Sequence, residues 1–176
     1  RVEKFSVVGS LKMIDEAQLV LLVLNGEDGP TEQDAHVAGY AFEKARPIVI
    51  LVNKWDEGTK KFKREEFEEK LELKMNYLSH CPVLYISAKT KKNLEKIYTA
   101  MLQVRDQSIK KIGTAELNRA FERIITHHAL PMHAGRVIKM YYATQTGKFP
   151  PSFTVFCNQP DHVHVTYKRY LINALR

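Results

Sequence analysis

The order of apolar runs in the first 110 residues constrains the fold of this chain most. Three runs are almost entirely apolar, with Asn25 as the polar end of the first, as expected for strands that are covered on both faces. They occupy residues 19–25, 47–52 and 83–86. Segments with apolar residues at helical spacing alternate with them, at residues 7–14, 31–44, 67–78 and 94–104. This αβαβαβα order predicts an α/β fold with a parallel sheet and helices on both faces, whose ligands bind beyond the carboxyl ends of the strands.

Local signals place the beginnings of two of these helices. A helical repeat of apolar residues starts at Val7 and continues to Ile14. Thr31 is expected to cap the next helix, with Glu32 and Asp34 in its first turn, because a hydroxyl accepts from the free backbone N–H groups and carboxylates favour that end.

Polar motifs follow two of the predicted strands. Asn53-Lys54-Trp55-Asp56 comes after the second apolar run, and Ser87-Ala88-Lys89 comes after the third. Because the carboxyl ends of parallel strands meet at one edge of a sheet, these two motifs are expected to form one site.

The residue types in these motifs suit recognition of a guanine base. Guanine presents N1–H and a 2-amino group on one edge, and a single carboxylate at Asp56 can accept from both. Adenine would leave that carboxylate unsatisfied and is therefore rejected. Asn53 can bond the opposite edge of the base or tie the loops together, the N–H of Ala88 can donate to guanine O6, and the Lys54 and Lys89 stems can cover the base faces.

N-K-W-D and S-A-K resemble the fourth and fifth nucleotide-binding motifs of the Ras-like GTPases. Further stretches resemble the second GTPase domain and the C-terminal domain of the Der (EngA) family of bacterial GTPases. These stretches are 2–6 with 11–12, 21–25 with 29–34, and 142–146 with 150–153. The resemblance covers essentially the whole chain.

This resemblance implies a bacterial, cytoplasmic protein with two tandem GTPase domains and a KH-like domain, which hydrolyses GTP and acts in assembly of the large ribosomal subunit. It implies GTP or GDP as ligand, with Mg²⁺ in the parent protein, at Asn53, Lys54, Asp56, Ser87, Ala88 and Lys89. The implied partners are the large ribosomal subunit or its RNA, and no membrane. The alternative is that this chain alone is a non-catalytic RNA-binding or protein-binding module.

The sequence departs from the GTPase pattern in its phosphate-binding elements. Neither G-x-x-x-x-G-K-[ST] nor D-x-x-G occurs, and the only Gly-Lys pair, Gly147-Lys148, has Tyr142 where the first glycine should be. We therefore expect base recognition without hydrolysis, no catalytic residue, and a chain that is a fragment. An N-terminal part of the same protein, or a second copy, is then expected to cover the edge of the strand at 19–25.

Charge divides the chain into two parts. Residues 1–110 hold 18 Lys or Arg and 17 Asp or Glu, whereas residues 111–176 hold nine against three and carry +6. We predict a Ras-like portion at 1–110 and a KH-like domain at 111–176 that is incomplete at its C-terminus. The basic second part favours a nucleic-acid partner.

The second part is predicted to be α-β-β-α. Thr114 is expected to cap a helix, residues 136–144 and 152–157 to form strands around a turn at 147–151, and Thr166 to cap a helix at 167–176. The G-x-x-G loop with which KH modules clamp a nucleic-acid backbone is absent from this part.

Other candidate residues are interpreted as structural. His127, His128, His162 and His164 lack neighbouring ligands at metal-site spacing and are expected at the surface, so we assign no metal site. Tyr141 and Tyr142 either pack across strands or stack on nucleic-acid bases, and the sequence leaves both readings open. Cys81 and Cys157 are too few for a disulfide framework, which fits a reduced cytoplasmic setting.

Overall fold

The computed structural model describes residue 9 and residues 11–130, 132–133 and 136–175. The chain divides into two compact units, Arg1–Gln107 and Ser108–Arg176, which we describe separately. Residues 9 and 11–16 are helical, as predicted for the first helix, whereas Val7 lies outside the described residues.

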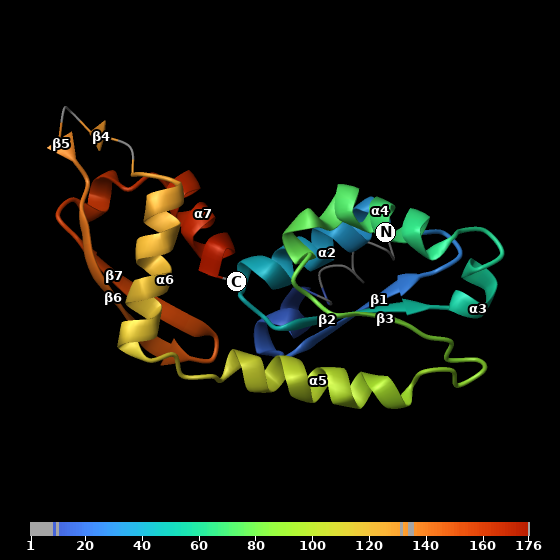
Figure 1. Cartoon of the computed structure of the whole chain (residues 1–176). Helices are drawn as coiled ribbons and strands as arrows, with labels where there is room; N and C mark the ends of the chain where they lie inside the picture. Colours follow the sequence, from blue (N-terminus) through green and yellow to red (C-terminus); the bar gives the residue numbers. More distant parts are fainter. Residues whose placement is uncertain (1–8, 10, 131, 134–135, 176) are drawn as a thin grey trace. The chain divides into compact units, whose positions relative to one another are not determined.

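The first unit is built on a parallel sheet of three strands (Figure 1). These are β1 (Val20–Asn25), β2 (Ile48–Asn53) and β3 (Val83–Tyr85), in that order across the sheet. β1 and β2 pair along their whole length, so that Asn25 and Asn53 lie opposite each other where the two strands end. The carboxyl ends of the strands therefore share one edge of the sheet, as the sequence predicts.

Helices pack on both faces of this sheet. They are α2 (Glu32–Glu43), α3 (Trp55–Gly58), α4 (Arg64–Met75) and α5 (Glu95–Ser108), with a 3₁₀ turn, η1, at Asn76–Leu78. Figure 1 shows α2 and α4 on one side of the sheet and α5 on the other. Leu24 and Phe67 are buried in the core under α2 and α4, and Val49 and Ala100 in the core under α5.

The start of α2 confirms its predicted cap. The Thr31 hydroxyl accepts from the Asp34 N–H at 3.2 Å, and the Asp34 carboxylate accepts from the Thr31 N–H at 2.8 Å. Two donors that the first turn would leave free are thus satisfied by one pair of side chains.

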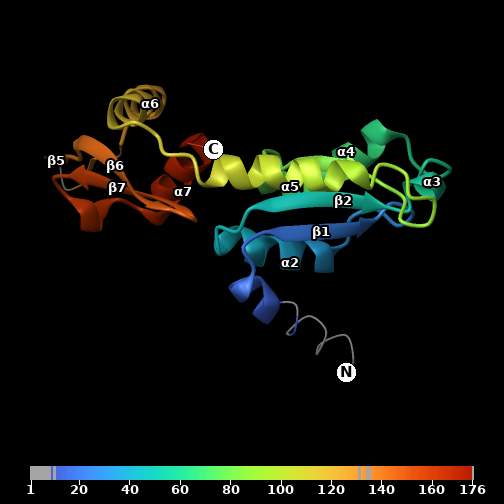
Figure 2. The same cartoon turned by 90° about the horizontal axis from the view of Figure 1, so that it is seen from below.

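The prediction that β1 is covered on both faces is wrong for this unit. Leu22 and Leu24 are buried, but Leu21 and Val23, which face the other way, are 38% and 55% exposed. On that face α5 packs against β2 and β3, and Figure 2 shows that it does not pass over β1. β1 also lies at an edge of the sheet, as expected.

The second unit places two helices against an antiparallel hairpin. Its elements are α6 (Thr114–His127), β4 (Met132–His133), β5 (Arg136–Val137), β6 (Met140–Lys148), β7 (Pro151–Cys157), the 3₁₀ turn η2 (Pro160–His162) and α7 (Val165–Leu175). Leu117 and Phe121 of α6 and Tyr167 and Leu171 of α7 are buried in one core with Ala143 of β6. The predicted α-β-β-α order is present, with an additional short pair, β4 and β5.

Several predicted boundaries in this unit are wrong. Gly113 rather than Thr114 is the cap of α6, and α7 begins at Val165, before Thr166. The strand predicted at 136–144 is broken, because the Asn158 side chain accepts from the Lys139 N–H and donates to the Val137 carbonyl, which diverts the backbone between β5 and β6. β6 extends to Lys148, so the hairpin turn shrinks to residues 149–150.

Candidate nucleotide-base site

The six predicted site residues lie at the carboxyl ends of two neighbouring strands of the first unit. Asn53 is the last residue of β2, Lys54 and Asp56 lie at the beginning of α3, and Ser87 to Lys89 follow β3. β2 and β3 are adjacent and parallel, with Val52 opposite Tyr85. The sheet therefore brings together two motifs that lie far apart in the sequence.

Asn53 links the two loops. Its side-chain Oδ1 accepts from the backbone N–H of Lys54 at 2.8 Å and from that of Ala88 at 3.0 Å. Of the two roles predicted for Asn53, the structure shows the loop tie. The Ala88 N–H, which we expected to donate to guanine O6, is engaged by Asn53 in this structure.

Asp56 carries the free acceptor of the site. Its Oδ1 atom is buried and has no hydrogen-bond partner among the described residues. The neighbouring Ser87 hydroxyl, a hydrogen-bond donor, is the main cause that lowers the pKa of Asp56; burial opposes the effect, and the charge of Lys89 reinforces it. The carboxylate is thus held ionised with one acceptor unused.

Ser87 is held in place by its own backbone and side-chain contacts. It is fully buried, its N–H donates to the Lys92 carbonyl at 3.2 Å, and its hydroxyl accepts from the Thr90 N–H at 3.2 Å. The hydroxyl that lowers the pKa of Asp56 is therefore held in a fixed position.

The two lysines of the motifs are exposed. Lys54 adopts a left-handed backbone conformation, with φ of 57°, and its Nζ lies 3.6 Å from Glu27 Oε2. This ion pair connects the loop after β2 to the loop after β1. The positive charge of Lys89 contributes to the lowered pKa of Asp56.

Three residues that sequence reasoning did not assign also shape the site. The Gly26 N–H donates to the Asn53 carbonyl at 2.7 Å, and a Cβ at Gly26 would lie 2.8 Å from that oxygen. A Cβ at Gly58 would lie 2.6 Å from the Gly26 carbonyl oxygen. Trp55 packs against Tyr85 with ring centroids 4.5 Å apart. The sequence shows Gly26 in N-G-E-D-G and Gly58 in D-E-G, but it gives no sign that these two glycines approach each other.

These residues fit a guanine base. The buried, unpartnered Oδ1 of Asp56 needs a donor, and guanine N1–H and its 2-amino group are donors on one edge. For a metal ion, the described residues contain no group of three His, Cys, Asp or Glu side chains that could hold one.

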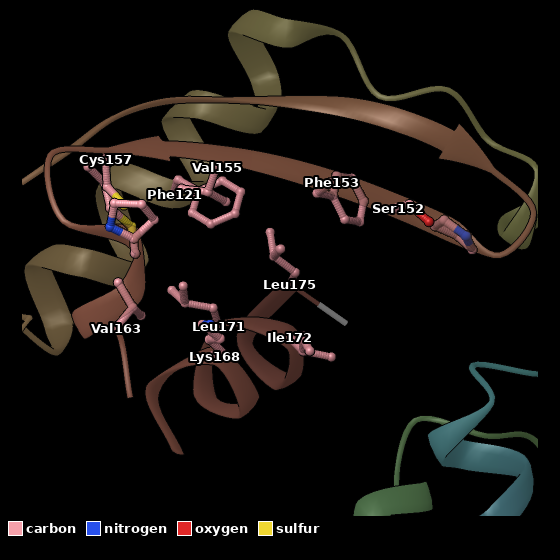
Figure 3. Close-up of a pocket in the computed structure, with 13 residues that line it drawn as sticks. Phe121, Ser152, Phe153, Val155, Cys157, Val163, Lys168, Leu171, Ile172 and Leu175 are labelled. Atoms are coloured by element: carbon pink, nitrogen blue, oxygen red, sulfur yellow. The ribbon is translucent and has the colours of Figure 1, made fainter. Parts of the chain in front are cut away.

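A separate cavity lies within the second unit. It has a volume of about 500 Å³ and lies between β7 and α7. Figure 3 shows Phe153 and Val155 of β7 facing Leu171 and Leu175 of α7 across it. Its lining is mainly apolar, with Lys168 and Ser152 as polar members.

Sequence comparisons match both units to families of known proteins. Residues 6–107 match the elongation factor Tu GTP-binding domain, and residues 111–176 match the KH-domain-like C-terminal region of EngA bacterial GTPase enzymes. The whole chain is 45% identical to a protein named GTPase Der from Geotalea daltonii. It is 42% identical to GTPase Der from Ligilactobacillus salivarius, over 99% of the chain. The chain spans 40% of the length of each of these relatives.

Solved structures show weaker likeness. The match to a probable GTP-binding protein, engB, covers 59% of this chain and 65% of the engB chain. The two are 21% identical, with a TM-score of 0.46. The match to Aquifex aeolicus Era bound to GDP·AlF4⁻ covers 93% of this chain and 61% of the Era chain, at 14% identity and with a TM-score of 0.44. Among the described helices, none is long and apolar enough to cross a membrane.

Proposed function

Because the chain belongs to the GTPase Der (EngA) family and carries a GTP-binding domain of the elongation factor Tu type, we propose that it recognises the guanine base of GTP and GDP. The binding residues in this proposal are Asn53, Lys54, Asp56, Ser87, Ala88 and Lys89. The observation that carries it is the buried Oδ1 of Asp56, which has no partner among the described residues and lies at the edge where ligands bind in parallel sheets.

Each part of the site has a distinct task in this proposal. Ser87 fixes the Asp56 carboxylate, which accepts from N1–H and the 2-amino group of guanine. Asn53 keeps the two loops together, so that the acceptor and the Lys54 and Lys89 stems approach one base. An adenine base has no donor for Asp56 and would leave a buried charge unsatisfied.

Hydrolysis belongs to the longer protein in this proposal. The parent protein hydrolyses GTP with Mg²⁺ at the nucleotide phosphates, and residues 1–110 are the C-terminal portion of its GTPase domain. The 176-residue sequence has no phosphate-loop motif, so we assign no catalytic residue and no Mg²⁺ ligand to it. We expect the chain alone to bind guanine nucleotide weakly and not to hydrolyse GTP.

The second unit supports a ribosomal role. Residues 111–176 form a KH-like domain with a charge of +6, which suits a polyanion such as ribosomal RNA. We therefore propose that the protein acts in the bacterial cytoplasm in assembly of the large ribosomal subunit. The same charge favours the second candidate, in which this chain alone is a non-catalytic RNA-binding module.

A nucleotide titration distinguishes these functions. Trp55 is the single tryptophan and lies within the N-K-W-D motif, so its fluorescence reports on the base site. GDP is expected to change this fluorescence in a saturable way, whereas ADP at the same concentration is not. Equal responses to GDP and ADP, or none to either, would contradict guanine recognition by this chain and leave the RNA-binding candidate.

A further inference from the structure

We propose that the open face of the β6–β7 hairpin is a stacking platform for the bases of single-stranded RNA. The inference rests on the RNA partner proposed above and names the surface that contacts it. It does not involve the base site of the first unit.

Two aromatic rings form the centre of this platform. Tyr142 of β6 and Phe156 of β7 lie opposite each other, with ring centroids 4.3 Å apart and planes at 15°. Both are substantially exposed, at 50% and 40%. Their neighbours Ala143 and Val155 belong to the core on the other face of the hairpin.

A change of register brings a third ring to the surface. The pairing of β6 with β7 shifts between Met140 and Tyr142, which makes Tyr141 an extra residue in the ladder. Such a bulge interrupts the alternation of side chains, and Tyr141 and Tyr142 are both exposed although they are consecutive. A cross-strand pair that only stabilises the hairpin would not require this third exposed ring.

The stacked pair can be extended on both sides. Tyr142 and Phe156 each turn one ring face to the other, and the described sheet that carries them has only the strands β6 and β7, so no third described strand lies beside either ring. A base can therefore continue the stack beyond either ring, as aromatic side chains do in single-strand binding proteins.

The charge of the hairpin and its flanks, taken as a whole, favours RNA over a protein or an apolar ligand. No Asp or Glu occurs from residue 123 to residue 160, whereas Lys139 and Lys148 lie just before and at the end of β6. Thr144 and Thr154 are opposite each other next to the rings and add hydroxyl donors. Aromatic faces, hydroxyls and cations without carboxylates match bases, sugars and phosphates.

The test uses the whole chain and fluorescein-labelled ten-nucleotide oligo(U) and oligo(A), with a duplex RNA of equal length for comparison. Anisotropy is measured for the wild type, for Tyr142→Leu with Phe156→Leu, and for the conservative Tyr142→Phe. Tyr98→Leu is the matched control, because Tyr98 is also an exposed tyrosine, at 67%, and lies in the first unit. The melting temperature checks that each variant is folded.

We expect the double variant to lose at least fivefold in affinity for the single strands, since base–aromatic stacking contributes about 1–3 kcal/mol per base. The salt dependence should stay unchanged, because no phosphate contact is removed. Tyr142→Phe and Tyr98→Leu should bind like the wild type.

Unchanged single-strand binding by a folded double variant would overturn the platform and leave the RNA partner standing. A wild type that binds none of the RNAs would overturn both. If the double variant instead loses self-association while RNA binding persists, the face is a protein contact and the proposal is wrong.

Discussion

Asp56 has a buried carboxylate oxygen without a partner among the described residues, and the neighbouring Ser87 hydroxyl lowers the pKa of its carboxyl group. Asp56→Asn should abolish the preference for guanine, because an amide accepts from one donor and sets an N–H against the other. Each unsatisfied group costs about 1–3 kcal/mol, or about 5- to 150-fold in affinity. The variant should gain affinity for xanthosine diphosphate, which offers an acceptor there.

Calorimetric titration of GDP and xanthosine diphosphate measures this exchange. Glu57→Gln is the matched control, since it removes the same charge one residue away. An Asp56→Asn protein that binds GDP as tightly as the wild type would show that the base pocket lies elsewhere.

Ser87 determines how acid affects this site. The pKa of Asp56 lies below its ordinary value of 3.8, mainly because of the Ser87 hydroxyl. A lowered pKa in the folded state stabilises the protein above the unfolded value, and this contribution is lost as the pH falls through the folded value. GDP affinity should therefore not depend on Asp56 ionisation between pH 8 and about pH 5.

Ser87→Ala should raise the pKa of Asp56 toward the ordinary value, and carboxyl-carbon NMR titration measures that shift. Ser79→Ala, which changes an exposed serine, should leave the pKa unchanged. If Asp56 titrates at the same pH in Ser87→Ala as in the wild type, the hydroxyl does not control the carboxylate.

At the level of elements, the loops after β2 and β3 are joined through one amide side chain. Asn53→Ala removes the acceptor of two backbone N–H groups, so the loops should separate and GDP affinity should fall. Asn53→Asp retains an acceptor oxygen. Hydrogen exchange at the Ala88 amide should be faster than wild type in Asn53→Ala and protected in Asn53→Asp; equal protection in all three proteins would refute the tie.

The exposed edge strand β1 predicts association of chains. Leu21 and Val23 are exposed on a strand at the end of the sheet, and such edges pair with other chains unless a charge or proline interrupts them. Val23→Lys should lower the average mass measured by light scattering. Leu73→Lys, at an exposed leucine of α4, should not. A wild-type chain that stays monomeric at all concentrations would contradict this prediction.

At the scale of the whole molecule, charge separates the proposed nucleotide-binding and RNA-binding roles. Residues 1–110 are nearly neutral, whereas residues 111–176 carry +6. RNA affinity should therefore fall steeply with salt. Lys168→Glu with Arg169→Glu should reduce the log–log slope by up to about 1.4 for single strands, at about 0.7 for each phosphate contact.

The matched control for that measurement is Lys60→Glu with Lys61→Glu, which reverses the same charge in the first unit. Filter binding across a salt series gives both slopes, and GDP titration should be unaffected by the second-unit variant. RNA affinity that is indifferent to salt would point to a protein partner.

Local sequence was enough to predict the order of strands and helices, the Thr31 cap and the two motifs at strand ends. Each of these depends on residues close together in the chain, through apolar periodicity or through hydrogen bonds within one turn. Parallel pairing of β2 and β3 follows from that order, which is why all six predicted site residues lie on adjacent loops.

Contacts between distant segments determine which groups meet and which faces remain open, and these required the folded structure. The bond from the Ala88 N–H to Asn53, the contact of Ser87 with Asp56 and the close approach of Gly26 to Gly58 join separate segments. Exposure of Val23 depends on where α5 packs. The stack of Tyr142 on Phe156 depends on their pairing across two strands, and the exposure of Tyr141 depends on a register shift, which no local pattern encodes, because side-chain direction is set by pairing across space.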